Sequence, residues 1–114
     1  MTLQQALDAF DLAFPNDFDR AERIRWLSEL DGRVWDQILR HRNPALPMPV
    51  YDAQTPGDTE LAIPQPYTGL YLLYSRMQAD LAYGEVARYN NSARLFNTQL
   101  MELHRHWIRT HLHP

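Results

Sequence analysis

The chain has 114 residues, a formal net charge of -3 and no cysteine. This length fits one domain with a single core, and the absence of cysteine excludes disulfides, thiolate nucleophiles and cysteine-ligated metals. Hydrophobic residues make up 45% and charged residues 22% of the chain, which is typical of a folded protein rather than a disordered one. The acidic balance argues against a free-standing nucleic-acid binder, which needs positive charge to neutralise phosphates.

No segment has the pattern of a signal peptide or of a membrane span. The first residues contain Asp8 and Asp11 among apolar side chains and lack a basic region. No apolar run approaches the roughly 20 residues that cross a bilayer. We therefore expect a soluble protein that is made in the cytoplasm and has no membrane partner.

The first predicted helix is short and begins after Thr2, a residue type that favours helix N-termini. Apolar residues then recur at helical spacing, at Leu3, Leu7, Phe10 and Phe14. Pro15 and Asn16 interrupt this pattern and end the helix.

A second, longer helix is predicted to begin at Asp17 or Asp19, where negative charge suits the helix dipole. It ends before Pro44, and its last turn holds Arg40, His41 and Arg42. Its apolar face consists of Ile24, Leu27, Leu30, Val34 and Ile38, with Trp26 and Trp35 at the flanks. Gly32 predicts a bend or a close contact. Asp31 lies near the apolar face, and we expect it to pair with Arg23, Arg25, Arg33 or the basic C-terminal tail.

Residues 43–66 are predicted to form a proline-rich extended loop or arm within the domain. Six of the eight prolines of the chain fall in this stretch, so it is not helical. Connections of this length inside a domain are more often functional or flexible than idle. Two interpretations are open: the segment is an arm that binds a partner, or it is an extended strap laid over the helices.

Two further helices are predicted after the arm. The third follows Pro66, which fits a first helical turn, and its apolar positions are Tyr67, Leu70, Tyr71, Tyr74, Met77 and Leu81. The fourth is the most regular, with Val86, Tyr89, Ala93, Phe96, Leu100, Leu103 and Trp107. Gly84 between them is interpreted as the turn of a helical hairpin, with a kink as the alternative. The predicted fold is mainly α, a four-helix bundle-like single domain over residues 1–114.

The residue types for catalysis or cofactor binding do not occur in a recognisable pattern. Four of the five histidines lie in the final eleven residues, at His104, His106, His111 and His113. No HExxH motif, paired carboxylate or cysteine accompanies them, and the interleaved arginines favour a cationic helix end over a metal site. There is no nucleophile elbow and no glycine-rich phosphate loop. We therefore expect no catalytic residues, no cofactor and no metal, and a protein that is not an enzyme.

Three segments of the chain carry distinctive motifs: IRWLSELDGRV from Ile24 to Val34, TELAIPQPYTGLYLLY from Thr59 to Tyr74, and GEVARYNNSARLFN from Gly84 to Asn97. These segments resemble a group of small tail-connector proteins from tailed bacteriophages and prophages. The densest motifs are WLSELDG, the Pro-Tyr entry to the third helix, and RYNNS. None of them is a chemical signature, so no catalytic or ligand residue is carried over.

The resemblance implies a head-tail connector or adaptor in the neck region of a virion, assembled in the bacterial host cytoplasm. Such a subunit forms a homo-oligomeric ring beneath the portal and links the capsid to the tail. The implied partners are further copies of the chain, the portal protein, and a stopper or tail-completion protein. DNA passes through the lumen without specific binding, which an acidic chain suits.

Nine residues are the candidate partner-binding residues. We expect Pro64, Pro66, Tyr67 and Tyr71 to shape the junction between the arm and the third helix. Tyrosine suits either a core whose hydroxyls reach the rim or an interface, and both interpretations are open. A polar contact between helices or subunits is expected at Tyr89, Asn90 and Asn91, and a contact with an acidic neighbour at Arg105 and Arg109.

Two other classes of function compete with the connector. The first alternative is a small helical DNA-binding or regulatory protein that reads DNA with the helix from Ile24 to Arg40. Its arginines would meet phosphates, but Glu29, Asp31 and Asp36 would repel the duplex. The second alternative is a small helical enzyme, which requires a cleft that gathers carboxylates and histidines.

Overall fold

The computed structural model describes residues 1–41 and 44–111. In these ranges the chain forms four α-helices and one short 3₁₀ helix. The α-helices are α1 (Leu3–Ala13), α2 (Arg20–Gln37), α3 (Gly69–Ala82) and α4 (Val86–His111). Arg42, Asn43, His113 and the side chain of His111, which figure in the sequence predictions, lie outside the described part. The predicted mainly helical, bundle-like fold is confirmed.

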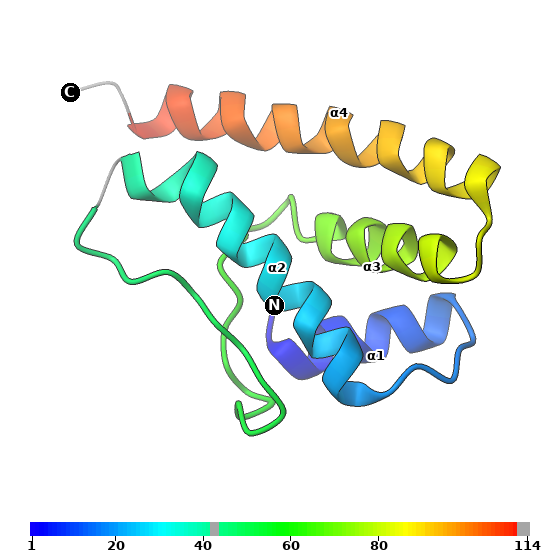
Figure 1. Cartoon of the computed structure of the whole chain (residues 1–114). Coiled ribbons are helices and arrows are strands. Elements are labelled where there is room, and N and C mark those ends of the chain that lie inside the picture. Colours follow the sequence, from blue (N-terminus) through cyan, green and yellow to red (C-terminus); the bar gives the residue numbers. More distant parts are fainter. Residues whose placement is uncertain (42–43, 112–114) are drawn as a thin grey trace.

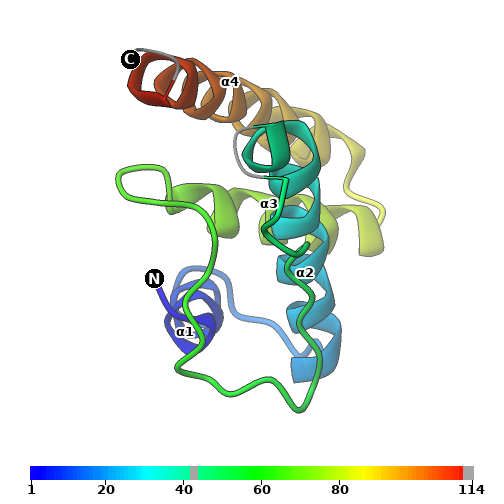
Figure 2. The ribbon, with the colours of Figure 1, turned by 90° about the vertical axis from the view of Figure 1, so that its left-hand side faces the viewer.

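The helices are arranged around α3 (Figure 1). α4 runs along one side of α3, and α1 and the lower part of α2 lie on the other side. The view turned by 90° shows the same order, with α4 and α1 at opposite ends of the molecule (Figure 2). α4 therefore packs mainly against one helix, whereas α3 is covered on several sides.

α1 begins with the hydrogen-bonded cap that the sequence predicts at Thr2. The Thr2 hydroxyl accepts from the Gln5 backbone N–H over 3.1 Å, and the Gln5 side chain accepts from the Thr2 N–H over 2.9 Å. This reciprocal arrangement satisfies two free donors of the first turn. The helix buries one face, made of Leu3, Ala6, Leu7 and Phe10.

α2 begins after Asp19, as expected, but the Asp19 side chain makes no capping hydrogen bond. The helix is shorter than predicted, because it ends at Gln37 and continues as a 3₁₀ turn over Leu39–His41. Its buried face holds the predicted apolar residues and also Trp26 and Asp31. A β-carbon on Gly32 would lie 3.7 Å from Met48 Sδ of the proline-rich segment, which is an ordinary van der Waals distance, so the predicted close contact does not require glycine here.

α3 begins later than the sequence pattern predicts. Pro66 is not in its first turn, because residues 64–67 form a turn in which the Tyr67 N–H donates to the Pro64 carbonyl over 2.9 Å. The Gln65–Pro66 peptide bond is cis. The helix starts at Gly69, after the N-cap residue Thr68.

The predicted hairpin between the last two helices is confirmed, and Gly84 is its turn. Gly84 has φ 72°, a left-handed conformation that glycine adopts without strain. The Glu85 N–H donates to the Asp80 carbonyl over 2.9 Å and closes the end of α3. α4 then returns along α3 and buries Phe96, Leu100 and Leu103 against the rest of the core.

Two apolar clusters form the interior. The larger one contains residues from all four α-helices together with Leu61 and Ile63 of the proline-rich segment. The smaller one joins Phe10, Trp26 and Ala79, with the Phe18 ring edge-on to Trp26 at 4.9 Å between centroids. Trp26, predicted at the flank of its helix, is therefore a core residue.

Candidate functional site

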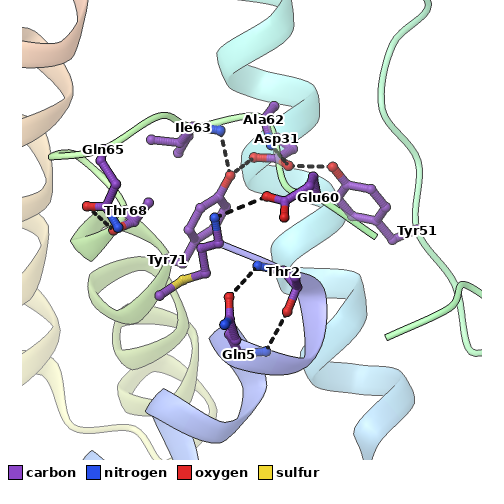
Figure 3. Close-up of polar contacts among 11 residues, drawn as sticks. Thr2, Gln5, Asp31, Tyr51, Glu60, Ala62, Ile63, Gln65, Thr68 and Tyr71 are labelled. Atoms are coloured by element: carbon purple, nitrogen blue, oxygen red, sulfur yellow. Dashed lines mark hydrogen bonds and ion pairs between the residues drawn. The ribbon is translucent and has the colours of Figure 1, made fainter. Parts of the chain in front are cut away.

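The residues around Asp31 join three parts of the fold that are distant in sequence (Figure 3). Asp31 is on the buried face of α2 and is 0% exposed. The Tyr71 hydroxyl donates to its Oδ1 over 2.7 Å. Its Oδ2 accepts from the Tyr51 hydroxyl over 2.6 Å and from the Ala62 N–H over 2.9 Å. The carboxyl group therefore ties α2 to α3 and to two points of the proline-rich segment.

The partners of Asp31 are neutral, which corrects the prediction that an arginine pairs with it. Arg23 contacts Asp11 instead, and Arg25 lies between Glu22 and Glu29. Burial raises the pKa of Asp31 above its ordinary value, and the hydrogen bonds from Tyr51, Ala62 and Tyr71 act in the opposite direction. Burial and the neighbouring Asp31 carboxyl also raise the pKa of Tyr51 and of Tyr71.

Residues 44–66 lie over the helices as an extended strap in the described part of the segment. The Leu3 N–H donates to the Thr59 carbonyl, and the Leu61 N–H donates to the Met1 carbonyl, both over 2.9 Å. Near the other end, the Trp35 indole donates to the Leu46 carbonyl over 3.0 Å. The strap interpretation therefore agrees with the structure better than the interpretation of a free arm.

Tyr71 does not present a surface to a partner in this fold. It is 2% exposed, and its hydroxyl accepts from the Ile63 N–H over 2.7 Å while donating to Asp31. Its predicted role in direct partner binding is wrong, because the ring is needed in the core. It does lie at the junction between strap and helix, where Pro64 and Pro66 are exposed and Tyr67 is half-buried with its ring 5.3 Å from that of His106.

The structure separates the three residues predicted to form a polar contact. Tyr89 packs half-buried against the core. Asn90 lies at a small pocket beside Gly84, whereas Asn91 lines a different pocket with Arg76 and Arg88. Both asparagine side chains are exposed, and neither is hydrogen-bonded to another described residue. The two asparagines therefore form no polar contact between the helices of this chain, and a contact between subunits stays a prediction.

The outward side of α4 carries arginines and apolar side chains together. Arg94, Met101, Arg105 and Ile108 follow one another at spacings of seven, four and three residues, and Arg109 lies four residues after Arg105. These five residues therefore share one side of the helix, and all five are exposed. We call this row the α4 outer stripe. Arg105 makes an ion pair with Glu102 over 3.4 Å at the surface, and pairs of this kind contribute little to stability. The stripe thus combines charge available for a partner with apolar area.

An apolar pocket of about 360 Å³ lies where the strap meets α2 and the end of α4. Its lining includes Trp35, Trp107, Pro47, Pro49 and Pro64. We call it the proline–tryptophan pocket. The helical spacing places Trp35 at a helix flank and Trp107 on the apolar face of the last helix, and no sequence pattern indicates that the strap brings them together.

The described residues do not gather a metal site, and the comparisons with known proteins give no match. Within residues 1–41 and 44–111, no group of three or more His, Asp or Glu side chains is placed to hold a metal ion. None of the described helices has the length and apolar character needed to cross a membrane. Comparison with protein-family models, curated proteins and solved structures finds no match.

Proposed function

We propose that this chain is a structural subunit of a virion neck, a head-tail connector that assembles into a ring beneath the portal. The observation that carries the proposal is the α4 outer stripe. α4 has 26 residues and packs against α3, so its opposite side is left to the surface. Met101 is 55% exposed there and Ile108 is 42% exposed, between arginines. Arginine and methionine are enriched in protein interfaces, which favours contact with another protein chain.

The proline–tryptophan pocket supports the same function. Pockets lined by tryptophan are suited to an apolar anchor residue from a partner, and such anchors supply much of the affinity of an interface. The hydrogen bond from Trp35 to Leu46 and the proline-rich backbone hold the pocket in shape before any partner arrives. A preformed pocket lowers the entropic cost of binding. The portal or the stopper protein is the partner that the sequence resemblance implies.

The arrangement of the arginines on α2 weakens the DNA-binding alternative. Arg23 is engaged by Asp11, and Arg25 by two glutamates. The Arg33 guanidinium lies 5.5 Å from the centre of the Phe96 ring. Each of these three arginines therefore already contacts another side chain of the same subunit rather than being held ready for a phosphate. The side of α2 that carries Asp31 faces the core.

Electron microscopy of the concentrated protein, alone and mixed with the portal protein encoded in the same genome, tests the connector function. We expect closed rings with a central channel, and rings stacked on the portal in the mixture. Single subunits in both samples, together with duplex DNA binding that weakens steeply as salt rises, would favour the regulatory alternative instead.

A further inference from the structure

We propose that the α4 outer stripe of one subunit binds the acidic side of α1 in the next subunit, so that each subunit uses two different surfaces. This inference rests on the proposed function, because it specifies the contact by which the ring would form. A contact between two different surfaces repeats from copy to copy, and it closes into a ring when the rotation between neighbours allows it.

The charges of the chain are divided between these two sides. The first nineteen residues contain four aspartates and no arginine, lysine or histidine. The strap adds Asp52, Asp58 and Glu60, again without a basic residue between positions 44 and 66. α4 contains four arginines and one glutamate. The chain as a whole is acidic, so the surplus of positive charge on α4 is a local feature.

The fold keeps the two sides apart. α1 and α4 lie at opposite ends of the molecule in both views, with α3 between them (Figures 1 and 2). They therefore cannot neutralise one another within a single subunit. In the described part of the chain, Arg94 and Arg109 have no acidic partner, and neither Asp8 nor Asp58 has a basic one.

The apolar residues of the two sides are also complementary. On α1, Gln4, Asp8 and Leu12 follow one another at intervals of four residues on the outward side of the helix. Leu12 is 89% exposed, the most exposed large apolar side chain described. Asp58 is nearby, because a β-carbon on its neighbour Gly57 would lie 3.3 Å from Gln4 Cβ. We call this set the α1 acidic face. The α1 acidic face thus has an exposed apolar residue, Leu12, beside acidic side chains. The α4 outer stripe has exposed apolar residues, Met101 and Ile108, beside arginines.

The chemistry of the basic side favours a carboxylate-bearing protein surface. The chain has eleven basic residues apart from histidine, and all of them are arginines. The planar guanidinium binds a carboxylate through two parallel hydrogen bonds, which a lysine ammonium does not do. A second copy of the chain carries such carboxylates on its acidic side, and further copies are present wherever the protein is.

Charge-reversed pairs of variants test the contact. The basic-side variant is Arg94→Glu with Arg109→Glu, and the acidic-side variant is Asp8→Arg with Asp58→Arg. We expect each variant alone to remain at the monomer mass of 13.4 kDa at concentrations where the unmodified chain assembles. Mixed in equal amounts, the two variants restore assembly, because each new acidic surface then faces a new basic one. Far-ultraviolet circular dichroism verifies that each variant is folded.

The matched control is Arg20→Glu with Arg88→Glu, which changes the net charge as much as the basic-side variant does. Both arginines are exposed and lie outside the α4 outer stripe and the α1 acidic face, so this control should assemble normally. Assembly of the acidic-side variant alone, or failure of the mixture to assemble, would overturn the proposed contact while leaving the ring intact as a proposal. Failure of the unmodified chain to assemble at any concentration, both alone and with the portal protein, would overturn both.

Discussion

The hydroxyl of Tyr71 donates a hydrogen bond to Asp31 Oδ1 over 2.7 Å, although the two residues are 40 positions apart in the sequence. The same hydroxyl accepts from the Ile63 N–H over 2.7 Å. One side chain therefore joins α2, α3 and the strap. Since the strap forms part of the proline–tryptophan pocket, this small network holds a surface that we assign to partner binding.

Removing the Tyr71 hydroxyl should destabilise the fold. Tyr71→Phe leaves the Ile63 N–H and one oxygen of Asp31 without their partner in the core, which costs about 2 to 3 kcal/mol in the free energy of unfolding. Urea denaturation followed by circular dichroism measures this loss. The control is Tyr74→Phe, whose hydroxyl bonds to Glu29 at the surface and should cost less than about 1 kcal/mol. Equal small losses in the two variants would contradict the role given to Tyr71.

The pKa of Asp31 makes the stability of the chain depend on pH. Burial raises this pKa above the ordinary value of 3.8, so the folded state keeps its proton at pH values where the unfolded state has lost it. The contribution of Asp31 is therefore greatest below about pH 3.8 and decreases as the pH rises through the raised pKa. The pKa of Asp11 is lowered instead, so its contribution to the free energy of unfolding changes with pH in the opposite sense. The pH dependence due to such carboxyls must be subtracted before the contribution of Asp31 can be measured.

Comparison with Asp31→Asn isolates this effect. The difference in the free energy of unfolding between the unmodified chain and the Asn variant should decrease as the pH rises above about 3.8. Urea denaturation at a series of pH values provides the curve. A difference that grows with pH over the same range would mean that the pKa of Asp31 is lowered rather than raised.

Phe96 should behave as a core residue of α4. It is 0% exposed, so Phe96→Ala should lower the free energy of unfolding by about 3 to 5 kcal/mol. Its neighbour Leu95 is exposed, and Leu95→Ala should cost less than about 1 kcal/mol. A loss below about 1 kcal/mol for Phe96→Ala, accompanied by impaired assembly, would place Phe96 in an interface instead.

The turn between α3 and α4 requires glycine. Gly84→Ala places a β-carbon on a residue with φ 72°, which costs about 1 to 2 kcal/mol. Gly69→Ala is the matched control, since Gly69 is the first residue of α3 and alanine favours helix. Thermal unfolding of the two variants should therefore show a lower midpoint for Gly84→Ala and an unchanged or higher one for Gly69→Ala.

The helices could be predicted because their signals are local. The apolar spacing of α1 and α4, the cap at Thr2 and the turn at Gly84 each depend on residues close together in the sequence. The environment of Asp31 could not be predicted in this way, because its donors are Tyr51, Ala62 and Tyr71. The nearby arginines suggested an ion pair, but Arg23 and Arg25 lie on other sides of α2 and contact other acids.

The proline–tryptophan pocket was missed for a related reason. Trp35 and Trp107 are on helices far apart in the sequence, and only the path of the strap brings prolines between them. Prolines excluded helix from this segment but did not indicate where it runs. The late start of α3 has a local cause, the turn over residues 64–67, which the apolar spacing alone did not reveal.

The proposed ring depends on the claim that the chain self-assembles, and the mass of the unmodified chain in solution decides it. Light scattering coupled to size-exclusion chromatography, over a wide range of concentrations at low salt, measures this mass. We predict a discrete species at a fixed multiple of 13.4 kDa, which dissociates as salt rises because charges across an interface are screened. A mass of 13.4 kDa at every concentration would contradict the claim.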